Sequence, residues 1–291
     1  MNDNTIAILM PGDMGHAVGR VLREHGHDVI TCLKGRGDHT RRLAEAAGFR
    51  NVASLNEVVE QAGLLLSILP PAAALDQAHA VAEAMAATGS APTYVDCNAI
   101  SPDTAKNIGK IITGAGTVFI DSGIIGLAPG HGAGPRFYVS GANLDPMLAL
   151  DGKGFKVVAM GSEVGEASAI KMVYAGLTKG TWTLHTAVLM AAQRLGITEA
   201  VLKEFELSQS HTLSAMRTRV PFLPADSGRW IGEMEEIAAT FSSAGVTSGF
   251  HDGAADIFRL LAQTSFAGET RQTMDRSRTL EAALKVYADT K

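Results

Sequence analysis

The chain has 291 residues, of which 46% are hydrophobic and 19% charged, an ordinary globular composition that excludes wholesale disorder. Its 25 Lys and Arg against 30 Asp and Glu give a net charge of -5, which argues against a nucleic-acid-binding surface spread over the whole chain. Only Cys32 and Cys97 are present, so the sequence offers neither a disulfide framework nor a Cys-rich metal site.

The first half of the chain alternates short apolar runs with amphipathic segments. The apolar runs predict buried strands, and apolar residues that recur every three or four positions predict helices. Strands are expected over 5–10, 28–33, 64–69, 93–97, 118–121, 137–140 and 156–160. Helices are expected over 15–25, 40–47, 72–87 and 101–112. Apolar strands that alternate with helices indicate an α/β fold with a doubly wound parallel sheet.

The character of the sequence changes after residue 161. From Gly165 to Leu195 there is no Pro, and the apolar spacing predicts one helix of about 30 residues, longer than most globular helices. Further helices are expected over 199–218, 229–245, 254–263 and 269–288. We therefore expect an α/β domain over 1–161 and an all-α domain over 162–291.

A glycine-containing loop follows the first expected strand. Gly12 and Gly15 fit the second and third glycines of the dinucleotide fingerprint G-x-G-x-x-G, whereas Met10 stands in the first position. Backbone N–H groups at a helix N-terminus bind phosphate oxygens, so the loop still suits pyrophosphate. A plain strand-to-helix turn is the alternative, but the βαβ context favours nucleotide binding. Gly12, Asp13, Met14 and Gly15 are the expected cofactor contacts.

The end of the second expected strand indicates which nucleotide binds. NAD-binding proteins commonly place an acidic residue there, which bonds the ribose 2′-hydroxyl. This sequence has Lys34 and Arg36 instead, and no carboxylate before Asp38. A guanidinium suits a 2′-phosphate, whereas Arg41 and Arg42 read as exposed helix residues. We expect NADP, with NAD as the alternative.

Several motifs occur in a fixed order along the chain. They are the loop 10–15, the apolar run 66–70 that ends in Pro, the segment 96–102, the segment 121–127 and the helix start 165–175. In this order they resemble the motifs of the β-hydroxyacid dehydrogenase superfamily, which includes 3-hydroxyisobutyrate and 6-phosphogluconate dehydrogenases. The resemblance implies a Rossmann-type domain, a helical domain, a homodimer with entwined helices and an active site between the domains.

Three stretches are similar to one branch of this superfamily, in which the C-terminal part is the domain of unknown function DUF1932. They cover 134–141, 171–180 and 229–241. The substrates of that branch are poorly assigned, so the resemblance implies a reaction class and leaves the substrate open.

The resemblance also implies site residues. It places Leu69, Pro70 and Asn98 at the cofactor, and Ser122, Gly123 and Ile124 at the substrate. Tyr174 and Thr178 are expected at the substrate because of their place on the helix of Lys171. The chain departs from the family in two places. Ile125 stands where the small hydroxy-acid enzymes have a carboxylate-binding Ser, and Tyr174 and Ala175 stand where the family has an Asn pair. Ser122 is the alternative donor to a substrate.

Lys171 is the expected catalytic residue. It lies in an apolar stretch, where helix statistics alone favour a Lys that extends outward to water. It occupies the position of the family's Lys, which implies an acid/base that exchanges a proton with the carbinol oxygen. Tyr174 and Thr178 share its helix face at i+3 and i+7. Tyr174 either bonds the substrate or packs as an aromatic.

Other polar residues suggest less specific roles. Lys179 is expected at the periphery or at a dimer contact, and Glu233 on a solvated helix face. The doublet His251-Asp252 is expected to cap a helix through Asp252. Arg229 either contacts an anionic substrate or pairs with a nearby carboxylate. No H-x-x-x-H or similar spacing is present, so we expect no metal.

The leading functional prediction is an NADP(H)-dependent dehydrogenase acting on the CH–OH group of a small compound. Imine reduction is an alternative, although relatives with that activity usually lack the Lys. A non-catalytic regulator that senses NADPH is another. The N-terminal residues lack the basic region of a signal peptide, and no apolar run is long enough to span a membrane. We expect a cytoplasmic protein with neither membrane nor nucleic-acid partners.

Overall fold

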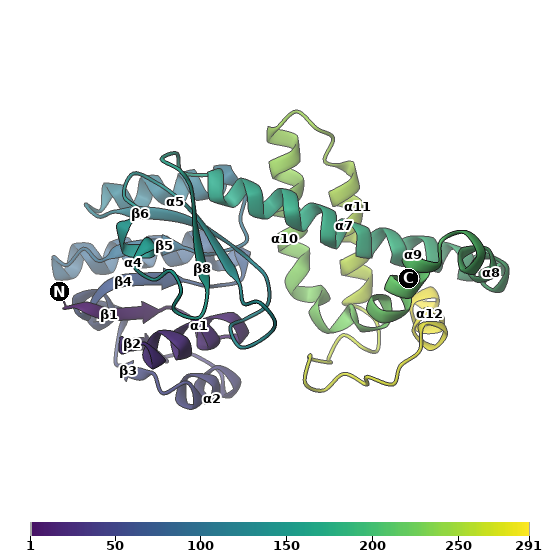
Figure 1. Cartoon of the computed structure of the whole chain (residues 1–291), viewed down its shortest axis with the longest axis horizontal. Coiled ribbons are helices and arrows are strands. Elements are labelled where there is room, and N and C mark those ends of the chain that lie inside the picture. The colour runs from purple at the N-terminus through teal and green to yellow at the C-terminus, as the bar shows by residue number, and fades with distance from the viewer. Residues whose placement is uncertain (1, 291) are drawn as a thin grey trace. The chain divides into compact units, whose positions relative to one another are not determined.

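The structure is a computed structural model that describes residues 2–290 (Figure 1). The chain forms two compact units, which divide between Met172 and Val173. The boundary predicted from the sequence, between 161 and 162, coincides with the end of the last strand. The first turns of the long helix that follows belong with the sheet, so the first unit extends into that helix.

The first unit is built on an eight-stranded sheet with the order β3-β2-β1-β4-β5-β6-β7-β8. All neighbouring strands are parallel except β6 and β7, which are antiparallel. The predicted doubly wound α/β fold is confirmed, with this one antiparallel pair near the edge. The strands are β1 Asn2–Ile8, β2 Asp28–Cys32, β3 Arg50–Val52, β4 Ala62–Ser67, β5 Thr93–Asp96, β6 Phe119–Ile125, β7 Arg136–Ser140 and β8 Lys156–Gly161.

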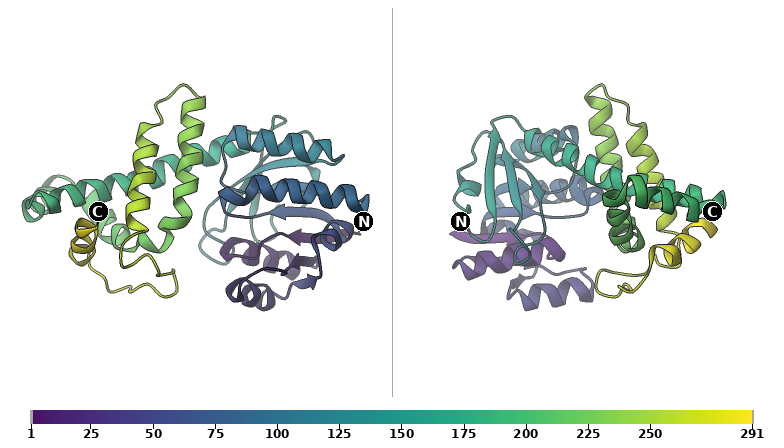
Figure 2. Two further views of the ribbon diagram at one scale, coloured as in Figure 1. Left: turned by 180° about the vertical axis from the view of Figure 1, so that it is seen from behind. Right: turned by 45° about the vertical axis from the view of Figure 1, so that its right-hand side comes forward.

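Helices cover both faces of this sheet (Figures 1 and 2). Side chains alternate across a strand, so Ile6 and Ile8 of β1 join one hydrophobic cluster with α1, and Ala7 joins a second cluster with α3, α4 and α5. Both clusters are buried, which fixes the register of β1. The helices of this unit are α1 Asp13–Glu24, α2 Asp38–Ala46, α3 Leu55–Gln61, α4 Ala74–Thr88, α5 Pro102–Gly114 and α6 Asp145–Leu148.

The structure adds β3 and α3 between residues 50 and 61, where the sequence analysis predicted no element. Ser54 caps α3 by accepting the backbone N–H of Glu57 at 3.2 Å, and the Glu57 carboxylate accepts the backbone N–H of Ala53. The arrangement is close to a capping box, with the Glu57 carboxylate on the residue before the cap, and the S-x-x-E signature of that motif is visible in the sequence. β3 has only three residues, too few for a periodicity signal.

The second unit is entirely helical. Its helices are α7 Glu166–Arg194, which begins in the first unit, α8 Thr198–Ser208, α9 Ser210–Arg219, α10 Pro224–Ser243, α11 Gly249–Leu261 and α12 Leu280–Asp289. The single long helix predicted over 165–195 is confirmed by α7. The helix predicted over 199–218 is two helices, because the backbone leaves the helical region at Gln209. No described helix is long and apolar enough to cross a membrane.

The last helix is shorter than predicted. It begins only after Thr279, which caps it by accepting the backbone N–H of Ala282 at 3.2 Å. The preceding segment is held by Arg278, which donates to the Pro221 carbonyl and pairs with Glu269. These tertiary bonds stabilise an irregular path that local helix propensity does not reveal.

Candidate functional site

The glycine loop leaves the N-terminus of α1 open. Gly12 precedes the helix, and no side chain caps it. A Cβ on Gly12 would meet only the Met10 side chain, at 3.7 Å, whereas one on Gly15 would lie 2.4 Å from the Met10 carbonyl oxygen. Gly15 therefore lets α1 pack on the end of β1, and Gly12 keeps an approach open to the first-turn N–H groups. This geometry fits a pyrophosphate.

Arg36 reaches the same place from the loop after β2. Its Nη2 donates to the Leu9 carbonyl at 3.3 Å, and its Nη1 lies 3.8 Å from the Met10 Sδ. Arg41 braces the loop, because its guanidinium donates to the carbonyls of Arg36 and Leu33 at 2.9 and 2.6 Å. The sequence analysis took Arg41 for a merely exposed helix residue and so missed this positioning role.

The remaining residues predicted around the cofactor phosphates differ in their exposure. Lys34 is exposed in the turn that carries Arg36. Asp13 is in the first turn of α1 and lies 3.8 Å from the His39 imidazole. Met14 is half-buried and packs against the core cluster beneath α1. Arg36 is therefore the cation whose contacts place it at the end of β1, next to the glycine loop.

Asn98 ties the ends of β4 and β5 together. Its Oδ1 accepts the backbone N–H of Leu69 at 2.5 Å, and its Nδ2 donates to Ser67 Oγ and Asp96 Oδ2 at 3.1 and 3.0 Å. The Asn98 residue is only 2% exposed. Its carboxamide therefore holds the Leu69–Pro70 turn in place, and this positioning role is what the geometry shows for a residue predicted at the cofactor.

The strand order reverses between β1 and β4. In open α/β sheets, ligands bind beyond the carboxyl ends of the strands at such a reversal. The Gly12 loop follows β1 and the Leu69–Pro70 turn follows β4, so both flank this point. β5 and β6 are parallel to β4, which places their carboxyl ends on the same edge of the sheet.

Lys171 is held against β6 by close backbone packing. A Cβ on Gly123 would lie 2.4 Å from the Ala167 carbonyl oxygen and 2.8 Å from the Lys171 Cβ. Only a glycine lets the first turns of α7 approach the strand this closely. The structure thus brings Gly123 and Lys171 together, as the resemblance implied. The neighbouring Ser122 and Ile124 are 0% and 8% exposed, so a substrate reaches them only if the surrounding side chains move.

Asp121 anchors the start of α7, a role that the sequence analysis missed. Its Oδ2 accepts the backbone N–H groups of Gly165 and Ser168 at 2.9 and 3.0 Å and the Ser140 hydroxyl at 3.1 Å. Its Oδ1 accepts the Ser168 hydroxyl at 2.6 Å. Burial raises the pKa of the Asp121 carboxyl, and the bonds from Ser168, Gly165 and Ser140 oppose that rise. The signal for this role in the sequence was the position of Asp121 at the start of the motif 121–127, in an expected buried strand.

Two further predicted substrate residues lie on α7 beyond Met172. The Tyr174 side chain is 48% exposed, which fits a contact residue better than a packed core aromatic. The Thr178 hydroxyl donates to the backbone carbonyls of Tyr174 and Ala175 at 3.3 and 3.2 Å. The helix backbone therefore already takes the Thr178 proton.

Lys179 and Glu233 correct the sequence analysis. They form an ion pair with an Nζ–Oε1 distance of 2.8 Å, and each side chain is only 9% exposed. Lys179 is thus neither peripheral nor available to a partner, and Glu233 is not on a solvated face. The pairing joins α7 to α10 across a sequence separation that helical periodicity does not report.

The remaining polar predictions resolve into local contacts. Arg229 pairs with Asp226, at an Nη2–Oδ1 distance of 2.5 Å. The predicted cap through Asp252 is wrong, because Ser248 precedes α11 and no side chain caps it; Asp252 lies inside the first turn and accepts the Ser248 hydroxyl at 2.7 Å. Within residues 2–290, the structure has no group of three His, Cys, Asp or Glu side chains that could hold a metal ion.

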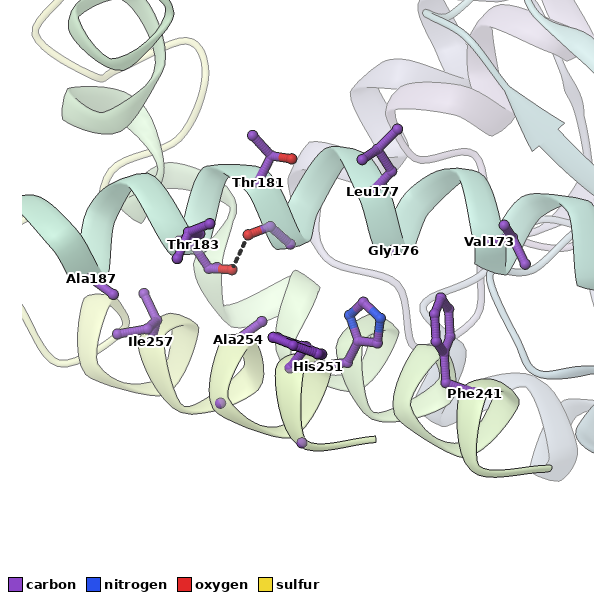
Figure 3. A pocket seen from close by; sticks show the side chains of 15 residues that line it. Val173, Gly176, Leu177, Thr181, Thr183, Ala187, Phe241, His251, Ala254 and Ile257 are labelled. Atoms are coloured by element: carbon purple, nitrogen blue, oxygen red, sulfur yellow. Dashed lines mark hydrogen bonds between the residues drawn. The ribbon is translucent and has the colours of Figure 1, made fainter. Parts of the chain in front are cut away.

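The helical unit carries an apolar groove of about 680 Å³ between α7, α10 and α11 (Figure 3). Leu177, Leu184 and Phe250 line it and are 72%, 62% and 80% exposed. The buried His251 imidazole lies between Phe241 and the α7 backbone, where Gly176 leaves room for it. Burial lowers the pKa of His251, so the neutral imidazole suits this apolar wall.

Comparisons with known proteins agree with this geometry. Residues 5–150, half of the chain, match the model of the NAD-binding domain of 6-phosphogluconate dehydrogenase, and residues 192–261 match the domain of unknown function DUF1932. An uncharacterised 28.5 kDa protein of Methanothermus fervidus is 30% identical over 179 residues, which are 62% of this chain and 67% of that protein.

Solved structures share the fold over nearly the whole chain. A conserved protein of unknown function, described as structurally similar to 3-hydroxyacid dehydrogenases, is 27% identical with a TM-score of 0.65, over 89% of this chain and 96% of its own. The 3-hydroxyisobutyrate dehydrogenase of Mycobacterium tuberculosis is 19% identical with a TM-score of 0.67, over 97% and 98%. An imine reductase of Myxococcus stipitatus is 17% identical with a TM-score of 0.54, over 97% and 98%. The chain therefore belongs to the 6-phosphogluconate dehydrogenase-like family of NAD(P)-binding oxidoreductases, in the branch that carries the DUF1932 domain.

Proposed function

We propose that the protein is an NADP(H)-dependent dehydrogenase that acts on the CH–OH group of a small compound, with Lys171 as its general acid/base. The observation that carries the proposal is the packing of Lys171 on Gly123 in β6. β6 is parallel to β5 and β4, so the carboxyl ends of these strands lie at the same end of the sheet. The glycine loop and the part of β6 that contacts Lys171 are therefore both at this end.

The preference for NADP(H) rests on Arg36. Its guanidinium lies at the end of β1 beside the glycine loop, where NAD-binding proteins commonly present a carboxylate to the ribose. A guanidinium fork binds a phosphate through two parallel hydrogen bonds, which a hydroxyl cannot reciprocate. Arg41 donates hydrogen bonds to backbone carbonyls of the loop that carries Arg36 and so fixes the conformation of that loop. A loop that is already ordered loses less conformational entropy when the cofactor binds.

The chain's own residues supply binding, orientation and a proton site. A bound nicotinamide would accept or deliver the hydride. The α1 N-terminus and Arg36 bind the phosphates, and the Asn98-tethered turn at Leu69 lies on the other side of the strand reversal. Lys171 Nζ accepts the proton of the carbinol oxygen during oxidation and returns it to the carbonyl oxygen during reduction. Asp121 fixes the helix start from which Lys171 projects.

The substrate that fits this strand is less polar than a small hydroxy acid. Ile125 replaces the carboxylate-binding Ser of the hydroxy-acid enzymes and is 3% exposed, and the neighbouring Ser122 is fully buried. A lost hydrogen bond to a charged group costs on the order of 1.5–3 kcal/mol. We infer that 3-hydroxyisobutyrate is turned over poorly, and that a bulkier or more apolar alcohol is preferred.

We further propose that two copies pair through their helical units. The groove walls expose Val173, Leu177, Leu184 and Phe250, Val173 by 56%, and α7 also exposes Val188 by 38%. Large contiguous apolar patches on a protein surface mark interaction sites. A second copy covers this surface with the same apolar face, as the self-complementary interface of a two-fold dimer requires.

A substrate screen tests the proposed activity. Alcohols, hydroxy acids and cyclic imines are offered with NADP(H) and with NAD(H), and the reduced nicotinamide absorbance is followed. We expect NADP-dependent oxidation of at least one alcohol. Turnover of imines alone would favour imine reduction, and tight NADPH binding with no turnover of any compound would favour a sensor; either result contradicts the proposal.

A further inference from the structure

The two Trp residues of the chain lie together in the helical unit. Trp182 of α7 and Trp230 of α10 have ring centroids 5.3 Å apart, tilted by 38°. The guanidinium carbon of Arg219, the last residue of α9, lies 3.9 Å from the Trp182 centroid and 5.7 Å from the Trp230 centroid. Three helices thus meet at one cation stacked on an aromatic pair.

Arg219 lacks an anionic partner. Its Nε is buried and has no hydrogen-bond partner, and among the residues that the structure describes no carboxylate forms an ion pair with it. Burial lowers the pKa of the Arg219 guanidinium, an indication of how poorly water solvates it. Arginine nevertheless stays protonated in proteins, so a cation is held here. Stacking on Trp182 offsets only part of that cost.

The charges around Arg219 are unbalanced. Asp226 is the single acidic group that acts on it, while Arg229 and Arg271 both repel it. Asp226 already accepts from both of those arginines, through Arg229 Nη2 at 2.5 Å and Arg271 Nε at 2.9 Å. Lys179, whose Nζ lies 5.5 Å from the Trp230 centroid, is neutralised by Glu233. Asp226 is therefore the one carboxylate near three guanidinium groups, and it forms ion pairs with Arg229 and Arg271 only.

Asp226 also gives this group a fixed geometry. Its side chain is only 12% exposed and binds Arg271 through both of its oxygens, at 3.1 and 2.9 Å. Arg229 and Arg271 are thereby held in place, yet Arg271 uses only its Nε and keeps both Nη groups as donors. Arg219 and Arg229 each have the guanidinium carbon 5.7 Å from the Trp230 centroid, and Asp226 links Arg229 to Arg271. The guanidinium groups gathered here suit a planar or tetrahedral oxyanion.

We propose that Arg219, Arg229 and Arg271 form an anion-binding site in the helical unit, with Trp182 as its floor, for a carboxylate or phosphate group. One ligand oxyanion would bring the local charge from three cations against one anion close to balance. The site is separate from the cofactor loop and does not rest on the proposed function. Stacking of Arg219 on Trp182 as a purely structural contact is the competing explanation.

Intrinsic fluorescence tests the site directly, because both Trp residues of the chain are within it. Inorganic phosphate or malonate is titrated at constant ionic strength, with chloride as the balancing salt. We expect a saturable change in Trp emission. Tighter binding of phosphate would identify a phosphate ester as the ligand type, and tighter binding of malonate a carboxylic acid.

Variants then separate the two explanations. Arg219→Met keeps the apolar stem and is expected to weaken anion binding at least tenfold. Arg217→Met is the matched control on α9, because Arg217 is exposed and pairs with Glu206 instead. Arg271→Met leaves the Arg219–Trp182 stack in place and is expected to weaken binding several-fold. NADPH binding, followed by nicotinamide emission, is expected to be equal in all of them.

Two results would overturn the proposal. One is an emission change in the wild type that is linear in anion concentration or that chloride reproduces. The other is an unchanged anion affinity in Arg271→Met together with unchanged affinity in a folded Arg219→Met protein, as judged by circular dichroism. Either result would leave Arg219 as a structural contact, whatever the outcome of the substrate screen.

Discussion

At the scale of single residues, Arg36 carries the proposed cofactor preference. Arg36→Ala is expected to weaken NADPH binding about 10- to 100-fold, because a charge-assisted hydrogen bond contributes roughly 1.5–3 kcal/mol. NADH affinity is expected to stay nearly unchanged, since NADH has no 2′-phosphate. Fluorescence titration of both cofactors measures the two constants. Arg42→Ala, an exposed Arg on α2, is the control, and equal losses for both cofactors would refute the assignment.

Asp121 carries the link between β6 and α7. Asp121→Asn presents an amide group to some of the four donors that now bind the carboxylate, so buried donors lose their acceptor. The free energy of unfolding is expected to fall by on the order of 3 kcal/mol. Urea denaturation measures it. Asp145→Asn, at an exposed first turn, should stay within about 0.5 kcal/mol, and a similarly small effect at Asp121 would disprove the anchoring role.

At the scale of elements, substitution of Gly12, just before α1, and of Gly15, inside α1, is expected to have different effects on stability. Gly15→Ala forces a Cβ against the Met10 carbonyl, so α1 must shift from β1 and stability should fall. Gly12→Ala meets no such obstacle and has an ordinary φ of -81°, so its folded stability should match the wild type. It should nevertheless weaken NADPH binding, because the new methyl group faces the open α1 N-terminus.

Thermal denaturation and NADPH titration of both variants make the comparison. A Gly12→Ala protein that binds NADPH normally would show that the pyrophosphate does not approach the loop at this glycine. A Gly15→Ala protein of wild-type stability would show that the helix accommodates the methyl group without cost.

The sequence predicted elements well where periodicity is long. The helix over 165–195 and the strand that precedes the glycine loop were predictable from apolar spacing alone. The break at Gln209 and the late start of α12 were not, because tertiary hydrogen bonds of Arg278 and a local backbone change decide them. The S-x-x-E signature at Ser54 was visible but has no long apolar run behind it.

The residues of the candidate site also divide into those that could be predicted from the sequence and those that could not. Gly12, Gly15 and Lys171 could be predicted as site residues because a loop or a motif position fixes them within a few residues. Asp121 and the Lys179–Glu233 pair act across contacts between distant segments, which a single sequence does not report. Arg41 bonds carbonyls of the neighbouring loop, whose irregular backbone path has no periodicity signal. Their roles became visible only when the fold brought donor and acceptor together.

At the scale of the whole molecule, pairing of two copies is expected to depend on the exposed face of α7. Leu177→Asp places a charge on a groove wall that is 72% exposed in the single chain, so the fold should persist while the dimer dissociates. Analytical ultracentrifugation over a range of concentrations measures this. Leu207→Asp, at an exposed α8 position outside the groove, is the control. A dimer equally stable in the wild type and Leu177→Asp would place the interface elsewhere.

The proposed function of the whole molecule depends on proton transfer by Lys171. Lys171→Met keeps the length and the apolar stem and removes the amine. A positioned acid/base contributes about 10²–10⁴ in rate, and the variant should lose that factor with its NADPH affinity intact. Lys171→Arg should fail as well, because a guanidinium does not give up its proton at neutral pH.

Single-turnover hydride transfer, measured at matched cofactor occupancy in the wild type and in Lys171→Met, tests this claim most directly. A fall of about 10²–10⁴ in the transfer rate, with the fold and NADPH affinity unchanged, is the predicted result. Hydride transfer at nearly the wild-type rate in Lys171→Met would contradict it and would make Lys171 a structural residue of α7.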